Sequence, residues 1–521
     1  MTRPSRARLP FDDRGAALPF VLITMTLVIA GLGLSVDLGR AALAGREART
    51  MADLASLDAV RVLDGSPTAV LAPAVQAAAE RSAQRNGLAG DPAAAVTARA
   101  GTWTSATRTF TPTGPAEVPD AVEVTVRNAG EGMFLRESFS PRRTAVATRS
   151  GLAGVWMGAA PAVLDADDAA LLNALAGEAL GVGASLSLAS WQAVASTRVT
   201  IADLAVAAGL PPAQVRTVLD QSMTADAAIR LLAAAAGGTS GGTALASLPG
   251  VAPPPVIVQL GQVLAVGESL GPLVDTSLSL LDLARGVLEV ASVGQPITTT
   301  FTVPVSGASG TTATVVILDA HALTVGRAGA SAHTVRARAS IDLTLDAPAN
   351  GNVVHVPLVI DLTSGTATLT AVTCSAAGTG TPGQVDVAVQ TGAATVGIGT
   401  FDGSGAVVPG TITTAPPLTP VEAVGTTTVP GVAAALGFTT YDLAATQTVG
   451  AVPAPGAAVE SILAVTGDPS LTADVEPPLR SAVPPIIDAV GPALADLLGV
   501  NLGAADIAVP GAGCTAPALV R

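Results

Sequence analysis

The residues best suited to chemistry by type and spacing are two short serine motifs. The stretch GTSGG at 238–242 matches G-x-S-x-G, with Ser240 at the position of a hydrolase nucleophile. A nucleophile elbow needs a strand before the serine and a helix after it. Here the run LLAAAA precedes the motif, and its flanks are rich in Gly, Thr and Ser. We therefore interpret 238–242 as a flexible linker.

The stretch DTSLS at 275–279 matches D-x-S-x-S, which opens a metal-ion adhesion site in von Willebrand-type domains. One carboxylate and two hydroxyls, from Asp275, Ser277 and Ser279, suit a hard divalent cation. The motif lies inside a helical leucine pattern, however, and not at the end of a buried strand. We favour Asp275 or Ser277 as the cap of a helix.

The histidines and the acidic clusters give no stronger signal. No two histidines have the spacing of a zinc-ligand pair; they are His321, His333 and His355. An acidic group that suits the dipole at a helix N-terminus consists of Asp165, Asp167 and Asp168. The sequence thus indicates no catalytic, cofactor-binding or metal-binding residue, no cofactor and no small-molecule substrate, so we expect a protein that is not an enzyme.

Composition bounds the partners and the compartment. The net charge is −14, and no basic patch interleaved with aromatic residues follows the N-terminal tail, which argues against nucleic acid as a partner. The only cysteines are Cys374 and Cys514. We expect them to form a structural disulfide in an extracytoplasmic compartment, because neither has a neighbouring His or Arg to activate a thiol.

One element dominates the N-terminal region. The 21 residues from Ala16 to Val36 carry no charge, and a helix of that length spans roughly 30 Å, the thickness of a bilayer core. We expect a transmembrane anchor whose apolar positions include Ala16, Phe20, Leu27, Leu34 and Val36. A cleaved signal peptide is the alternative, because a weak small-x-small site lies at 42–44 and the start is rich in Arg.

The flanks of the span set the orientation that we expect. Four arginines precede it, and about 480 residues follow it. We expect a single-pass protein of the cell membrane, with its N-terminus in the cytoplasm and its bulk outside. After the span, a Gly- and Pro-free stretch at 46–64 predicts that the helix continues, with a stripe of small residues at Ala44, Ala48, Met51, Ala55, Ala59 and Val62. Such a stripe suits close packing against a sheet or another helix.

Farther along, the pattern predicts an α+β protein. A second helix at 69–85 is followed by an antiparallel hairpin or small sheet within 95–150. Mainly helical patterns follow, including one from Pro211 to Ala236, and then Thr- and Val-rich strands. We expect loops at 400–430, a helix at 481–500 and a strand near 504–509. The sequence leaves open whether 151–521 is one domain or two.

We divide the chain accordingly into five parts. They are a cytoplasmic tail at 1–14, an anchor at 15–37, a stalk helix with a pilin-like α/β head at 38–150, a mainly helical region at 151–297, and a β-rich domain with a C-terminal helix and strand at 298–521.

The N-terminal third resembles the TadE/TadG-like pilus-assembly proteins of the Flp (tight adherence) system. These begin with a basic tail, Arg-Gly, an uncharged span, an Asp-x-Gly-Arg exit and an Ala/Asp-rich helix. The matching positions here are Arg14, Gly15, Asp37, Gly39, Arg40, Ala52, Asp53 and Ala55. The stretches ALLNALAGEALG, VPLVIDLTSGTATLTAVTC and GCTAPALVR resemble the long C-terminal extension of some TadG-like members.

The resemblance implies a membrane-anchored, non-enzymatic component of pilus assembly or cell-surface adhesion, whose partners are the membrane and other pilus-assembly or pilin-like subunits. Processed prepilins carry Glu five residues after the cleavage-site Gly. Counted from Gly15, that position is Phe20, which favours an uncleaved minor subunit. The alternatives are a secreted or anchored hydrolase or ligand-binding protein, and a cation-dependent adhesin that uses Asp275, Ser277 and Ser279.

Overall fold

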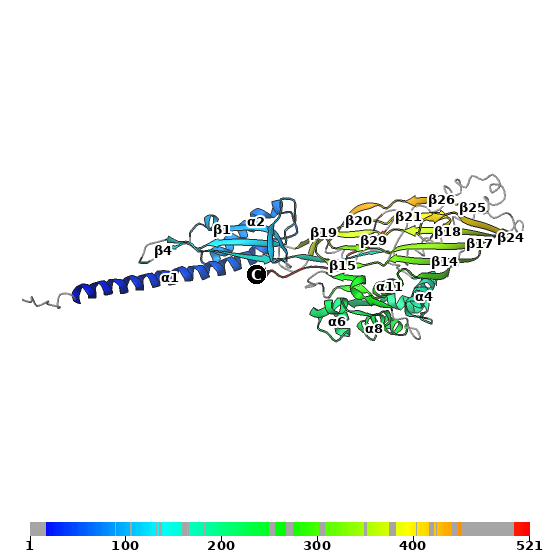
Figure 1. Ribbon diagram of the computed structural model, residues 1–521, viewed down its shortest axis with the longest axis horizontal. Coiled ribbons are helices and arrows are strands. Elements are labelled where there is room, and N and C mark those ends of the chain that lie inside the picture. The colour runs from blue at the N-terminus through cyan, green and yellow to red at the C-terminus, as the bar shows by residue number, and fades with distance from the viewer. Residues whose placement is uncertain are drawn as a thin grey trace, which may run out of the picture. The chain divides into compact units, whose positions relative to one another are not determined.

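The chain folds into two compact units, and its course passes between them twice. Unit 1 comprises 1–150 and 516–521, and unit 2 comprises 151–515. The computed structural model describes residues 17–88, 90–104, 107–131, 133–134, 138–158, 164, 166–181, 183–248, 256–266, 273, 275–301, 308–347, 352–374, 382–402, 404–415, 421–423, 425–439, 446–449 and 505–520. The helical and β-rich parts of 151–515 therefore belong to one unit (Figure 1).

Unit 1 is built on one long helix. α1 (Ala17–Val60) is 44 residues long. It runs without interruption from the apolar stretch into the stalk, because no proline lies at the junction between them. α2 (Thr68–Arg85) ends as its pattern predicts, at Asn86 and Gly87, where Gly87 takes a φ of 94° that suits glycine. A four-residue helix, α3 (Pro92–Ala95), is capped by Asp91.

The helices of unit 1 lie on an antiparallel sheet. Among the described residues its order is β2 (Thr109–Pro112), β1 (Val96–Thr104), β3 (Ala121–Arg127), β6 (Arg142–Thr148) and β31 (Ala518–Val520). A separate hairpin pairs β4 (Gly130–Glu131) with β5 (Ser138–Phe139). The predicted sheet within 95–150 is thus present, but its last strand comes from the far end of the chain. No local sequence pattern predicts that pairing.

In unit 2 the helical layer is more broken than its periodicity predicts. The described helices are α4 (Ala166–Leu180), α5 (Leu188–Ser196), α6 (Ile201–Ala207), η2 (Pro212–Gln214), α7 (Val215–Leu219), α8 (Ala225–Ala235), α9 (Ser240–Ala246), α10 (Leu260–Val263) and α11 (Leu280–Ala291). The single helix expected from Pro211 to Ala236 is wrong, because a strand interrupts it before α8. Thr224 then starts α8 by accepting the Ala227 N–H on its hydroxyl.

Two short antiparallel pairs tie this layer together. They are β8 (Arg198–Thr200) with β12 (Ser277–Ser279), and β9 (Ser222–Thr224) with β10 (Ile257–Gln259). Because each strand leads directly into a helix, the pairs hold the starts of α6, α8, α10 and α11 in place. The apolar faces of the helices pack together and against the sheets, and Figure 1 shows α4, α6, α8 and α11 on one side of unit 2.

Most of the remaining described strands of unit 2 form three larger sheets. One contains β11 (Leu264–Val266), β15 (Leu323–Gly326), β7 (Gly151–Gly158), β29 (Ala505–Ala508), β28 (Thr446–Val449) and β30 (Ala512–Cys514). The second contains β13 (Pro296–Phe301), β14 (Ala308–Asp319), β17 (Arg336–Ala347), β18 (Asn352–Leu362), β21 (Ala394–Ile398), β26 (Gly425–Val429), β24 (Gly410–Ala415) and β25 (Val421–Ala423). The third contains β16 (Ser331–His333), β19 (Thr366–Cys374), β20 (Pro382–Gln390) and β27 (Ala433–Thr439).

Of the expectations for the C-terminal region, the structure confirms one and contradicts another. The strand expected near 504–509 is β29, which pairs with β7 and β28. The loops expected at 400–430 are wrong for most of the described residues, because that stretch holds β24, β25, β26 and the pair β22 (Thr400–Phe401) and β23 (Val407–Val408). The helix expected at 481–500 lies outside the described residues.

Candidate functional site: the anchor helix and its packed stalk

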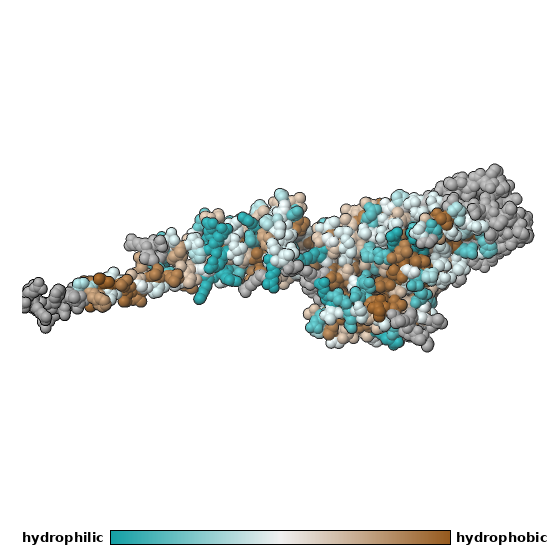
Figure 2. Space-filling view, viewed as in Figure 1, coloured by the Kyte–Doolittle hydropathy of each residue, from teal (hydrophilic) through white to brown (hydrophobic). Residues whose placement is uncertain are grey.

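The first half of α1 exposes apolar side chains on every face. Phe20, Leu27 and Leu34 are 69, 67 and 55% exposed, and the brown surface of Figure 2 follows this part of the helix. A helix of a soluble protein buries one apolar stripe, whereas this segment buries almost none. Among the described residues, α1 is the one helix long and apolar enough to cross a membrane, and a signal sequence near the N-terminus passes the same test.

The positions that match the family motif do not converge on one site. Arg14, Gly15 and Ala16 lie outside the described residues. Val36 is 42% exposed, like the other apolar positions of the segment. Gly39 has open space around it, and Arg40 is exposed.

Asp37 differs from its neighbours, because its side chain is only 7% exposed. One carboxylate oxygen accepts the backbone N–H of Met133 at 2.6 Å, and the other accepts that of Phe134 at 3.1 Å. The sequence marked Asp37 as the first charged residue after the uncharged span and as a position of the family motif. The structure shows that it also holds the end of the hairpin formed by β4 and β5.

The small-residue stripe of the stalk is buried within unit 1. Ala48, Ala55 and Ala59 are fully buried, and Met51 is 4% exposed, in a core shared with α2 and the sheet. The predicted packing of the stripe against a sheet and a helix is confirmed. Because residues of the same chain cover the stripe, it is not exposed to helices of other subunits.

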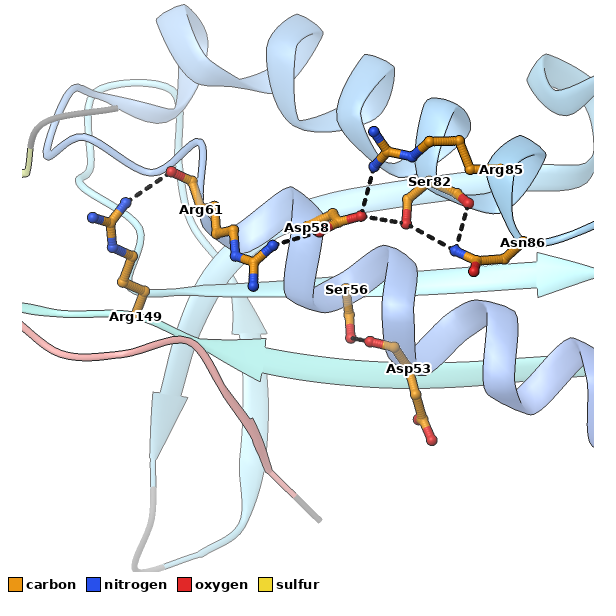
Figure 3. Close-up of polar contacts among 8 residues, drawn as sticks. All are labelled: Asp53, Ser56, Asp58, Arg61, Ser82, Arg85, Asn86 and Arg149. Carbon is orange, nitrogen blue, oxygen red and sulfur yellow. Dashed lines mark hydrogen bonds and ion pairs between the residues drawn. The ribbon is translucent and has the colours of Figure 1, made fainter. Parts of the chain in front are cut away.

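A polar network fastens α1 to α2 beside this core (Figure 3). The Asp58 carboxylate accepts from Ser82 Oγ at 2.7 Å and from Arg85 Nη2 at 2.8 Å, both on α2. Its other oxygen accepts from Arg61 Nη1 at 2.8 Å. Near the end of α1, Arg149 donates to the Arg61 carbonyl at 2.8 Å, and burial lowers the pKa of its guanidinium. These contacts hold the end of α1 against α2.

The two serine motifs are structural, and the flexible linker expected at 238–242 is wrong, because Ser240 begins α9 and Thr239 caps it. Ser240 opens α9, but helix α8 and a turn precede it, so the strand that a nucleophile elbow needs is missing. In the second motif Ser279, and not Asp275 or Ser277, caps the following helix, since its hydroxyl accepts the Asp282 N–H. The strand β12 takes up Ser277, so the predicted cap position was wrong by two to four residues.

In the described part of the chain, the acidic group near 165 and the histidines do not come together in one site. Asp165 lies outside the described residues, as does the side chain of Asp167, and Asp168 is buried in the first turn of α4. His355 Nδ1 lies 3.2 Å from Thr344 Oγ1 on the neighbouring strand. Among the described residues no three His, Cys, Asp or Glu side chains are grouped as metal ligands.

A buried charge cluster around α11 was missed by sequence reasoning. The Nδ1 atom of His321 lies 2.5 Å from Glu289 Oε2, and Arg285 Nε lies 3.0 Å from Glu289 Oε1. All three side chains are at most 1% exposed. The i,i+4 spacing of Arg285 and Glu289 inside an apolar helix was the available signal.

The electrostatics of this cluster follow from burial and from the neighbouring charges. Burial alone favours the neutral acid, but His321 and Arg285 outweigh it and hold the pKa of Glu289 below its ordinary value. Burial dominates at Asp282 and raises the pKa of that carboxyl. The cluster is enclosed, so we assign it to the stability of α11 rather than to catalysis.

The structure joins Cys374 and Cys514 by a disulfide, with their Cα atoms 6.0 Å apart. The bond links the end of β19 to the end of β30, in two different sheets of unit 2. It therefore ties the returning C-terminal segment to the β-rich part, as the sequence predicts for a bonded pair.

Comparison with known proteins gives one finding. A domain of unknown function, DUF8293, matches residues 168–293. The match runs from the first turn of α4 to just beyond the end of α11, so it coincides with the helical layer of unit 2. No curated protein and no solved structure matches the chain.

Proposed function

We propose that this protein is a membrane-anchored, non-enzymatic structural component of a Flp (tight adherence) pilus-assembly or cell-surface adhesion machinery. The observation that carries the proposal is α1. One continuous helix has a first half that is apolar and exposed all round, and a second half that packs on an antiparallel sheet. This is the outline of a pilin-like domain, and it begins with the motif that resembles TadE/TadG-like proteins.

Anchoring with the bulk of the chain outside the cytoplasm agrees with two further features. The uncharged stretch follows an Arg-rich tail, as in proteins that keep their N-terminus inside. Unit 2 contains a disulfide, which forms and persists in oxidising compartments. Phe20 at the position of the prepilin Glu favours an uncleaved minor subunit or assembly platform over a polymerised pilin.

The exposed part of α1 is the surface that this role offers to membrane partners. Gly31 has no atom within 4 Å of the position that a Cβ would occupy, which leaves room for close approach of another helix. Small residues favour such approach in lipid. Because the stalk stripe is already buried, contacts with pilin-like subunits fall to the anchor and to the outer surfaces of the two units.

The test is complementation of a strain that lacks the gene. We expect the deletion to abolish surface pili or adhesion, and the wild-type gene to restore them. Leu27→Arg should not restore them, because an Arg at the centre of a span opposes insertion by about 2.5–3.5 kcal/mol. The matched control is Leu54→Arg, at a partly exposed position beyond the span, and we expect it to complement.

Intact mass and N-terminal sequencing of the native protein separate anchor from signal peptide. An uncut chain that leaves the membrane only in detergent supports the proposal. A chain that starts just after Ala44 would be a secreted protein and would overturn it. A deletion strain with normal pili and normal adhesion would overturn it as well.

A further inference from the structure

The end of the hairpin formed by β4 and β5 carries two large apolar side chains that unit 1 does not cover. Met133 and Phe134 are 65 and 54% exposed. They follow β4 (Gly130–Glu131), and the backbone N–H groups of both contact Asp37 of α1. Figure 1 shows β4 near α1. Hairpin ends facing water are ordinarily polar, so two adjacent exposed apolar side chains indicate a contact surface.

This pair, which we name the hairpin tip, is docked on the anchor helix itself. Asp37 accepts the backbone N–H groups of both tip residues. One turn earlier, Gly33 is buried, and a Cβ at that position would lie 3.1 Å from Phe134 Cβ and Cγ. Gly33 and Asp37 therefore form one face of α1 that is shaped to receive the tip.

The docking contact fixes the depth of the tip relative to the uncharged span. Asp37 is the first charged residue after the span, and Gly33 lies four residues before it. At about 1.5 Å per residue, Phe134 contacts the helix roughly 6 Å inside the level of Asp37. Amphipathic segments that lie in a membrane interface bury their apolar face by about 5–10 Å.

We propose that the hairpin tip inserts Met133 and Phe134 into the outer interface of the bilayer and gives unit 1 a second membrane contact beside the anchor. This inference rests on the proposed anchoring of α1. In lipid, backbone N–H groups must be satisfied within the protein, and Asp37 satisfies those of both tip residues. Exposed arginines that can meet lipid phosphates lie on the stalk side of the tip; they are Arg40, Arg142 and Arg143.

The test measures the depth of the tip in vesicles with the full chain. The cysteines in the described part of the chain are paired in the disulfide, so Met133→Cys supplies one thiol for a polarity-sensitive fluorophore. The labelled protein is reconstituted into phosphatidylcholine–phosphatidylglycerol vesicles that contain lipids spin-labelled near the headgroup and, in a second set, along the acyl chain. A label at Leu27→Cys reports on the anchor. A label at Val118→Cys reports on the far end of unit 1. Val118 follows Glu117, whose carbonyl accepts the N–H of Thr68, the first residue of α2.

We expect quenching and a blue shift at position 133, and neither at 118. Adding Gly33→Leu should remove both effects at 133, because the larger side chain occupies the place of Phe134. Gly31→Leu is the matched control and should leave them unchanged, since a side chain at Gly31 meets open space.

The other outcomes would each overturn the inference. Quenching at 27 without quenching at 133 would leave the anchor standing and place the tip in water. No quenching at 27 by the acyl-chain spin label would refute the anchor as well. A label at 133 that is shielded only at high protein density, and that crosslinks to a second copy, would make the tip a protein contact.

Discussion

At the scale of single residues, Asp58 illustrates how unit 1 holds its helices together. Its carboxylate receives three donors, two of them from α2 (Figure 3). The side chain is 25% exposed, so water weakens the ion pairs, while the bond from the buried Ser82 hydroxyl is shielded. The network therefore stabilises the α1–α2 pair more through the shielded Ser82 hydrogen bond than through the ion pairs.

We predict that Asp58→Asn lowers the stability of the α1–α2 pair by about 1–2 kcal/mol. The reason is that the three groups that donate to Asp58 lose their charged acceptor. Hydrogen exchange of the α2 amides in the detergent-solubilised chain measures the loss. Asp53→Asn is the control, since Figure 3 draws no polar contact to the Asp53 carboxylate among the residues shown. Equal effects of the two variants would contradict the role given to Asp58.

A second prediction at this scale concerns Glu289. The pKa of Glu289 is held low in the folded state. Its carboxylate therefore stabilises the folded state above pH 4.5, the ordinary Glu pKa, and this stabilisation is lost as the pH falls through the lower pKa of the folded state. Glu289→Gln should destabilise unit 2 by about 3–5 kcal/mol at neutral pH, because the buried Arg285 loses its counter-charge. The deficit should shrink below pH 4.5 as the wild-type carboxyl is protonated.

Thermal unfolding of both proteins from neutral pH to about pH 3 tests this dependence. Burial raises the pKa of Asp282, and the charge of Glu289 adds to this, so Glu289→Gln also changes the pH dependence of Asp282. Both proteins are therefore compared in an Asp282→Asn background as well, in which this contribution is absent. The exposed residue Glu178 of α4 supplies the control Glu178→Gln, which we expect to change the unfolding temperature little at neutral pH. A deficit that stays constant with pH would contradict the assignment.

At the scale of elements, α1 joins two environments in one helix. Its first half has no buried stripe, and its second half buries small residues against α2 and the sheet. Alanine at these positions lets the backbones approach closely, so the packing tolerates little added volume. The same helix thus combines an exposed apolar half with a half that packs in a protein core.

We predict that Ala55→Leu destabilises unit 1 by about 1–3 kcal/mol through overpacking, because Ala55 is fully buried between the helix and its neighbours. Leu54→Ala, at a residue of α1 that is 38% exposed, should change the stability by less than about 0.5 kcal/mol. Limited proteolysis of the solubilised chain, with unit 2 as the internal reference, measures both. A harmless Ala55→Leu would mean that the stripe is not tightly packed.

At the scale of the whole molecule, the C-terminal segment closes both units. β29 and β30 pair with β7 of unit 2, and β31 pairs with β6 of unit 1. The disulfide joins positions 140 residues apart, and in the chain-entropy model a loop of that size contributes up to about 4–5 kcal/mol.

We therefore predict that a reductant lowers the unfolding temperature of unit 2, as followed by circular dichroism. A variant with both Cys374→Ser and Cys514→Ser should start from the lowered temperature and show no response to the reductant. The hydrogen exchange of α2, in unit 1, is the internal control and should stay unchanged. An unfolding temperature that does not respond in the wild type would contradict a stabilising bridge.

The sequence by itself determined the features that depend on local periodicity and charge. An uncharged stretch of fixed length predicts the apolar first half of α1, the spacing of small residues predicts its buried stripe, and Thr- and Val-rich alternation predicts the β-rich region. Each follows from neighbouring residues, because a helix or strand repeats its environment every few positions.

Only the tertiary structure decided what distant segments do to one another. It gave the sheet of unit 1 a strand from residues 518–520, broke the helix expected from Pro211 to Ala236 by pairing β9 with β10, and buried Arg285, Glu289 and His321 together. It also set Asp37 against the hairpin tip. These contacts join residues far apart in the chain, and their free energy depends on desolvation and geometry that no local pattern encodes.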